Sequence, residues 1–177
     1  LDLSKIEAGR MDLFLETFNV GDLIENIVGT TEPLVKKNNN EIEVFCSENL
    51  GEIHADSTRT RQILLNLISN AAKFTKDGRV CLSVKRQTGA GGDEFIFDVR
   101  DTGIGLSDDQ IAHIFQAFTQ ADSSTTRKYG GTGLGLSISQ SFAHMMGGGI
   151  TVKSTEGEGS IFSLRIPAKV KITAATI

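Results

Sequence analysis

The chain has 177 residues, which suits one globular domain or one domain with a short extra segment. Hydrophobic residues make up 39% and charged residues 23%, and the formal charge of −4 argues against a broad nucleic-acid-binding surface. No apolar run approaches the roughly 20 residues that cross a bilayer, and two cysteines without CxxC spacing suggest a reducing compartment.

Residues 1–9 are typical of the last turns of a helix that stops at Gly9. Because the chain starts inside that pattern and without Met, we expect residues 1–13 to be the end of a preceding helical domain. Residues 14–168 are then the folded domain. Residues 169–177 follow Pro167 and carry little pattern, so they are expected to be a tail or linker.

Short strands and two helices are predicted for the first half of the domain. A helix capped by Asn19 or Asp22 runs to Lys37, with a kink or break at Pro33. A second helix begins at Asp56 or Ser57. Its apolar stripe has 3.6-residue spacing and consists of Ile63, Leu64, Leu67, Ile68 and Ala71. Alternating apolar residues predict strands at 14–19, Glu41–Cys46 and Glu52–Ala55.

The second half begins with a predicted hairpin, whose strands 79–86 and 94–100 are joined by a loose loop at 88–92. Ser107 and Gln110 fit a capping box for a short helix. A longer helix is predicted from Gly133 to about Met146, and strands at 150–154 and 160–166 close the chain. Because strands and helices are intermixed without strict alternation, the pattern favours an α/β fold, a two-layer α/β sandwich with a mixed β-sheet packed on helices.

Asn66, Asn70 and Lys73 have i, i+4, i+7 spacing, so they share one face of the second helix. Amide oxygens and a cation at the margin of the core can hold a divalent metal and phosphate oxygens, because Mg²⁺ prefers oxygen ligands. The alternative is a solvated polar face, which is the commoner situation for such a triplet alone.

Asp101 ends a strand and continues the parity of its core-facing residues, so its carboxylate is expected at a buried edge. A buried carboxylate needs hydrogen-bond donors, and an adenine amino group is one candidate. Gly103 and Gly105 then allow the backbone to approach a flat base. A tight turn closed by an Asx hydrogen bond explains the same residues without a ligand.

Residues 131–136, with the sequence Gly-Thr-Gly-Leu-Gly-Leu, open the helix predicted near Gly133. Free amides at a helix N-terminus beside glycines bind phosphate. A Walker loop is excluded because the chain has no Gly-Lys dipeptide. A dinucleotide fingerprint is excluded because Leu136 and Ile138 stand where glycine is required. A simple glycine hinge is the alternative, and the two roles are compatible.

The polar stretch 119–129 has no periodicity and is long for a connection within a compact domain, so a functional or mobile loop is expected. Arg127 and Lys128 give it two cations that can close over a polyphosphate. A plain disordered loop is the alternative. Phe115 and Phe118 are expected to pin the start of the loop to the core.

Together these motifs resemble the catalytic ATP-binding domain of sensor histidine kinases of two-component systems, within the GHKL superfamily that includes gyrase B, HSP90 and MutL. The resemblance covers about residues 14–167. It identifies an N box at 66–75, a G1 box at 101–105, an F box at 115–118, a G2 box at 131–136 and a weaker G3 box at 157–160. Residues 121–130 resemble the ATP lid of hybrid kinases. The implied fold is the Bergerat fold, a mixed sheet packed on helices with a mobile ATP lid.

The resemblance also implies residue roles. Asn70 would supply the Mg²⁺ ligand, Lys73 would contact phosphates, and Asn66 would position the reacting phosphate. Asp101 would accept a hydrogen bond from the adenine amino group. The remaining contacts implied are Gly103 and Gly105 at the base, catalytic Arg127 with Lys128 from the lid, Gly131, Gly133, Leu134 and Gly135 at the phosphates, and Ser160 at the adenine end.

ATP and Mg²⁺ are the implied cofactors, and the implied reaction is γ-phosphoryl transfer to a histidine, for relay to a response-regulator receiver domain. None of His54, His113 and His144 has the acceptor's context, so the acceptor is expected on a separate dimerisation domain that ends within residues 1–13. The parent would be a homodimer anchored in the bacterial inner membrane, and this fragment a monomeric cytoplasmic domain.

Three other functions stay open from the sequence. An ATP-gated clamp of the gyrase or HSP90 kind is disfavoured by Asn66, because the hydrolysing relatives carry a glutamate there. A nucleotide-binding module without activity is disfavoured by the presence of Asn70, Lys73 and the lid cations. A serine kinase acting on an anti-sigma-type partner is disfavoured by the helix end at residues 1–9.

Overall fold

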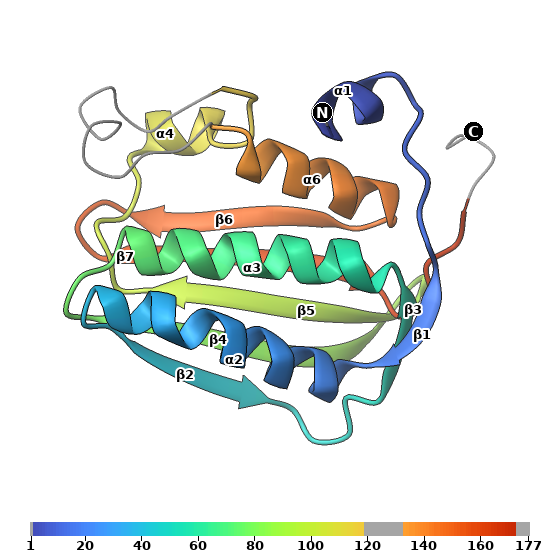
Figure 1. Cartoon of the computed structure of the whole chain (residues 1–177), viewed down its shortest axis with the longest axis horizontal. Coiled ribbons are helices and arrows are strands. Elements are labelled where there is room, and N and C mark those ends of the chain that lie inside the picture. Colours follow the sequence, from blue (N-terminus) through green and yellow to red (C-terminus); the bar gives the residue numbers. More distant parts are fainter. Residues whose placement is uncertain (1, 119–132, 173–177) are drawn as a thin grey trace.

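A mixed sheet covered by helices on one face forms the body of the protein in the computed structural model, which describes residues 2–118 and 133–172 (Figure 1). The strand order is β2-β4-β5-β7-β6. The strands are β2 (Glu41–Cys46), β4 (Arg79–Gly89), β5 (Gly92–Asp101), β6 (Gly149–Thr155) and β7 (Gly159–Pro167). β2 pairs with β4 in parallel and the other three pairs are antiparallel, so the predicted two-layer sandwich with a mixed sheet is confirmed.

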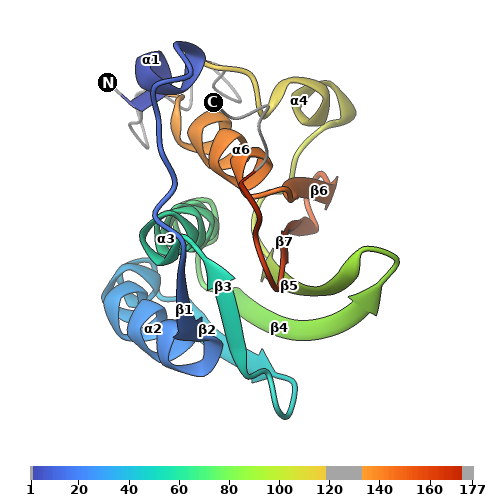
Figure 2. The same ribbon diagram turned by 90° about the vertical axis from the view of Figure 1, so that its right-hand side faces the viewer.

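Three longer helices make the second layer: α2 (Val20–Lys37), α3 (Ser57–Lys73) and α6 (Gly135–Met145). Figure 2 shows them stacked on one side of the main sheet. Two short helices, α1 (Asp2–Glu7) and α4 (Asp108–His113), lie on the α6 side of the molecule. A separate two-stranded sheet pairs β1 (Glu16–Asn19) with β3 (Glu52–Ala55) in antiparallel fashion.

The central helix α3 lies over β5 and follows the predicted pattern closely. The Asp56 side chain accepts a hydrogen bond from the Arg59 backbone N–H at 3.0 Å, which caps the first turn. All five residues of the predicted stripe are buried. They pack in one core with the fully buried Phe95 and Phe97 of β5. Burying a side chain of this size stabilises the fold by about 1.5–3 kcal/mol, so α3 and β5 anchor the layers to each other.

The elements differ from the predicted ones at a few places. α2 continues through Pro33 as one helix, so the chain does not break there. β4 and β5 extend to Gly89 and Gly92, because backbone pairing continues through Thr88 and Asp93 to a two-residue turn. The first strand begins at Glu16 rather than at residue 14. The capping box of Ser107 and Gln110 is confirmed.

The segments before β1 and after β7 also pack on the domain. Gly9 has the left-handed φ of 63° that ends α1. Beyond β7, Val170 is buried, and its backbone N–H donates to the His54 carbonyl at 2.8 Å. The packed part of the domain therefore reaches Val170, past the expected boundary at residue 168. No described helix is both long and apolar enough to span a bilayer.

Candidate functional site

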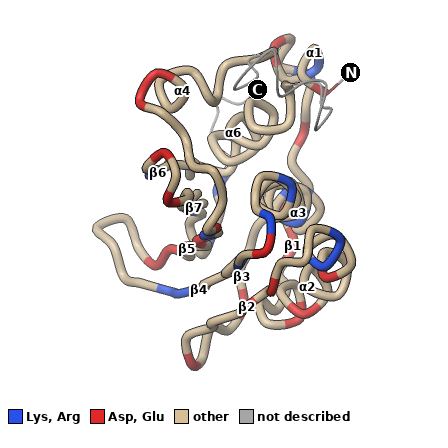
Figure 3. The backbone as a smooth tube through the Cα atoms, turned by 90° about the vertical axis from the view of Figure 1, so that its left-hand side faces the viewer, with Lys and Arg blue, Asp and Glu red and all other residues tan. Residues whose placement is uncertain are grey.

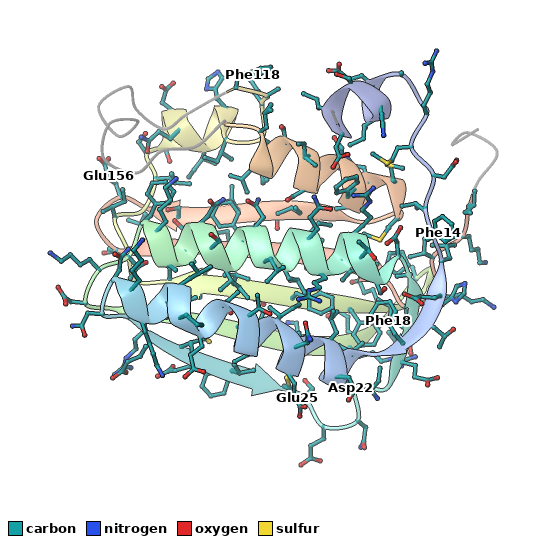
Figure 4. All side chains as sticks on the ribbon, in the orientation of Figure 1. Phe14, Phe18, Asp22, Glu25, Phe118 and Glu156 are labelled. Carbon is teal, nitrogen blue, oxygen red and sulfur yellow. The ribbon has the colours of Figure 1, made fainter. Side chains whose placement is uncertain are left out.

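The predicted site residues in the described chain gather at one end of the molecule, where α3 and β5 end and α6 begins (Figure 1). Figure 3 views this end, with α3 seen along its axis between α2 and α6. The turn between β6 and β7, which carries Glu156, lies at the same end, whereas Phe14 and Phe18 lie at the opposite one (Figure 4). Four separate stretches of sequence thus meet here.

Asn66 connects the predicted N box to the predicted G2 box. Its side-chain amide donates to the Ser139 hydroxyl of α6 at 3.2 Å. A Cβ atom at Gly135 would lie 2.6 Å from Asn66 Oδ1. A side chain at 135 would push the Asn66 amide aside, so glycine lets the first turn of α6 lie against Asn66 in its present position.

The first turn of α6 has no side-chain cap from the residues that the structure describes. Leu134 occupies the N-cap position and offers no side-chain cap to the N–H groups that follow. Gly133, just before it, has a left-handed φ of 69° and accepts a hydrogen bond from the Phe118 backbone N–H at 3.1 Å. This is the arrangement expected of an anion-binding helix N-terminus.

The last turn of α3 carries Asn70, Lys73 and the aromatic Phe74. Asn70 is half-buried, and its backbone carbonyl accepts a hydrogen bond from the Phe74 backbone N–H at 3.0 Å. The Lys73 ammonium lies 5.4 Å from the centre of the Phe74 ring. Partial burial lowers the pKa of Lys73, because the cation loses hydration. A phosphate near this ammonium would favour its charged form.

Asp101 is buried at the end of β5, as predicted. Its Oδ1 accepts the Gly103 backbone N–H at 2.9 Å. Burial raises the pKa of Asp101, and the Gly103 N–H, the Thr75 hydroxyl and the Ser160 N–H partly offset that rise. The Asx contact and the buried carboxylate, which were alternatives from the sequence, therefore occur together. The Ser160 hydroxyl lies 2.8 Å from the Ser154 hydroxyl, so it is engaged within the sheet.

Three glycines allow the loop after β5 to fit between α3 and the turn that joins β6 to β7. A Cβ at Gly103 would lie 2.3 Å from the Phe74 carbonyl oxygen. A Cβ at Gly105, where φ is +67°, would lie 2.1 Å from the Thr155 carbonyl oxygen. A Cβ at Gly159 would lie 2.0 Å from the Asp101 carbonyl oxygen. All three contacts are with backbone atoms, so these positions are fixed by close packing.

A cleft of about 490 Å³ opens beside this loop. Its wall is formed by Asn38, Lys73, Phe74, Thr75, Lys76, Thr102, Gly103, Ile104, Glu156 and Gly157. Lys73 and Gly103 were predicted as site residues. Phe74, Thr75 and Ile104 lie inside the predicted N and G1 boxes, but no role was predicted for them. Phe74 and the half-exposed Ile104 give this wall an apolar surface suited to a flat base.

Several predicted residues lie outside the described chain, namely Arg127, Lys128 and Gly131, with the rest of the predicted lid. Within residues 2–118 and 133–172, no cluster of three His, Cys, Asp or Glu side chains can hold a metal ion. A metal bound through a single amide oxygen such as that of Asn70 would need its other ligands from phosphate and water, which suits Mg²⁺.

Residues 55–170 match the family described as histidine kinase-, DNA gyrase B-, and HSP90-like ATPase. The chain is 39% identical over 175 residues to hybrid signal transduction histidine kinase B of Dictyostelium discoideum, covering 98% of this chain and 9% of that protein. It is 40% identical over 183 residues to the circadian input-output histidine kinase CikA of Synechococcus elongatus, covering 97% of this chain and 23% of that protein. The chain thus spans a small part of each relative.

Solved structures agree with these sequence similarities. The crystal structure of full-length ShkA in complex with AMPPNP matches with a TM-score of 0.82 and 34% identity, covering 99% of this chain and 35% of that chain. The catalytic domain of histidine kinase ThkA matches with a TM-score of 0.73 and 26% identity, covering 89% of this chain and 97% of that one.

Proposed function

The chain belongs to the histidine kinase-, DNA gyrase B- and HSP90-like ATPase family, and from this premise we propose that it is the catalytic domain of a sensor histidine kinase. In this proposal it binds Mg-ATP and transfers the γ-phosphate to a histidine of a separate dimerisation domain. A receiver-domain aspartate of a response regulator then takes the phosphoryl group. The parent is a membrane-anchored homodimer, and this chain is its cytoplasmic, monomeric catalytic part, with residues 1–13 ending the dimerisation domain.

The observation that carries the proposal is that α3 contacts two suitable groups: the loop that begins at the buried Asp101, and the α6 N-terminus, which has no side-chain cap. Asp101 is buried beside the cleft and suits the amino group of adenine. Lys73 and the first turn of α6 offer positive charge to the phosphates. A negatively charged acceptor is thus available for the base, and positive charge is available for the phosphates of the same nucleotide.

Asn66 fits phosphoryl transfer better than hydrolysis. An amide cannot act as a general base for water, whereas the acceptor imidazole is itself a nucleophile and needs no strong base from this domain. Catalysis would rest on positioning and charge neutralisation. Mg²⁺ held through Asn70 would neutralise phosphate charge, and Lys73, Arg127 and Lys128 would add to that effect.

The test is transfer of label from γ-labelled ATP to the parent's histidine-bearing dimerisation domain, supplied as a separate protein. We expect labelled phosphohistidine with the wild-type chain and none with Asn70→Ala. Asn26→Ala, an exposed asparagine of α2 far from the cleft, is the matched control and should keep full transfer. ATP hydrolysis without labelling would instead support a clamp-type ATPase, and absent or metal-independent ATP binding a non-catalytic module.

A further inference from the structure

Thr75, two residues after the end of α3, has a hydroxyl group with no role in the proposed function. Its side chain is 1% exposed. Thr75 Oγ1 makes no hydrogen bond of regular geometry to any residue that the structure describes. Leaving a buried hydroxyl in this condition destabilises the fold, because the group has lost its hydrogen bonds to water. Such a group calls for a functional explanation.

The surroundings of Thr75 fix the direction of this hydroxyl. The Thr75 carbonyl accepts a hydrogen bond from Asn40 Nδ2 at 2.8 Å, and Asn40 Oδ1 accepts the Gly78 N–H at 3.0 Å. Thr75 Cγ2 lies 2.8 Å from where a Cβ at Gly78 would be. Because the methyl group fills the space left by Gly78, Oγ1 is directed to the other side, towards the loop after β5.

On that side Thr75 faces Asp101. A Cβ atom placed on Gly103 would lie 2.7 Å from Thr75 Oγ1 and 2.9 Å from Asp101 Oδ1. The two oxygens therefore converge on one small space at the inner wall of the cleft. Asp101 Oδ1 already accepts the Gly103 N–H, so the Thr75 hydroxyl is available as a further donor to the same carboxylate.

We propose that Thr75 is a positioning residue for purine recognition: its buried hydroxyl holds the Asp101 carboxylate ionised and aimed at the exocyclic amino group of the base. This inference rests on the proposed function, because it assumes that Asp101 accepts from that amino group. Only the ionised carboxylate presents acceptors alone to the amino group. A neighbouring hydroxyl that donates to the charged form stabilises that form.

The charged groups around Asp101 leave this role to hydrogen bonds. The charged residues on the elements next to Asp101 are Lys73 of α3, Lys76 before β4, Arg79 of β4, Arg100 of β5, and Glu156 and Glu158 of the β6–β7 turn, and none of them is among the causes of its pKa shift. Burial raises the pKa of Asp101, and the nearby Gly103 N–H, Thr75 hydroxyl and Ser160 N–H lower it. Removing one donor of three should therefore raise the pKa of Asp101 in the chain without ATP.

The experiment compares Thr75→Val, which keeps the shape and removes the hydroxyl, with Thr75→Ser, which keeps the hydroxyl. Thr31→Val is the matched control, because Thr31 of α2 is equally buried and bonds only within its own helix. Carbon NMR of the Asp101 carboxyl measures its pKa without nucleotide. We expect Thr75→Val to raise that pKa by about one unit, with Thr75→Ser and Thr31→Val close to wild type.

Calorimetric titration with ATP across pH is the second readout. Thr75→Val should weaken ATP binding about threefold at a pH midway between the Asp101 pKa values of wild type and Thr75→Val. The loss should approach roughly tenfold well below both values and almost vanish well above both, where both carboxyls are ionised. An unchanged Asp101 pKa, or equal ATP affinities of Thr75→Val and Thr31→Val across this range, overturns the inference. If the wild-type chain binds no ATP, the proposed function fails instead, and the NMR result still decides whether Thr75 controls Asp101.

Discussion

Replacing Gly103 by alanine tests whether the loop after β5 must lie directly against the end of α3. The new Cβ would lie 2.3 Å from the Phe74 carbonyl oxygen, a backbone atom that cannot turn away. The loop would have to move outwards. Two hydrogen bonds would be lost: from the Ile104 N–H to the Phe74 carbonyl at 3.2 Å, and from the Gly103 N–H to Asp101 at 2.9 Å.

The first of these bonds is neutral and contributes about 1 kcal/mol, and the second ends on a carboxylate and contributes about 1.5–3 kcal/mol. We therefore expect Gly103→Ala to lower the free energy of unfolding by about 2–4 kcal/mol. For a domain of this size the unfolding midpoint should fall by roughly 6–12 °C. Differential scanning calorimetry and urea titration measure both quantities, and ATP affinity should fall as well, because Asp101 loses its Gly103 contact.

The same change at Gly29 is the control. Gly29 lies in α2, and a Cβ there would meet nothing within 4 Å. Gly29→Ala should stabilise the chain by about 0.5–1 kcal/mol through helix propensity. If the free energy of unfolding of Gly103→Ala is within about 0.5 kcal/mol of the wild-type value, as for an unconstrained surface change, then the close packing inferred for this loop is wrong.

Two further predictions concern Arg59 and Asp101. Arg59→Ala should lower the free energy of unfolding by about 1–2 kcal/mol and expose residues 2–13 to proteases, because the guanidinium lies 4.4 Å from the Phe142 ring centre and 3.8 Å from the Asp2 carboxylate. Arg61→Ala is the control, and equal rates of proteolysis in the two variants would contradict this prediction. The raised pKa of Asp101 means that the folded chain keeps a proton that the unfolded chain has lost. As pH falls through the folded pKa, wild type should gain stability relative to Asp101→Asn in urea titrations, and a pH-independent difference would refute this.

Elements with strong local signals were predicted well from the sequence. α3 is the clearest case, because Asp56 caps it and its apolar stripe has a single helical period. The bounds of β2 and β3 also agree, since turn residues such as Asn39, with a left-handed φ of 56°, end the neighbouring segments. Here local chemistry and final fold agree, so local reasoning suffices.

Features that depend on distant contacts were not predictable in this way. The hairpin is longer than expected because backbone pairing between β4 and β5 continues into the predicted loop, as far as Gly89 and Gly92. Val170 packs beside His54 although its segment carries little pattern. Thr75 was missed as a site residue because its burial depends on Gly78 and Gly103, and neither contact is visible along the chain.

The interlock between the loop after β5 and the turn between β6 and β7 has a consequence for biosynthesis. Besides the glycine contacts, the Gly157 N–H donates to the Ile104 carbonyl at 2.7 Å, and the Leu106 N–H donates to Ser154 Oγ at 2.8 Å. A ribosome delivers the chain from its N-terminus at about 5–20 residues per second. Asp101 and its loop thus emerge seconds before the hairpin that encloses them, and a nascent chain has no completed base site until β6 and β7 are made.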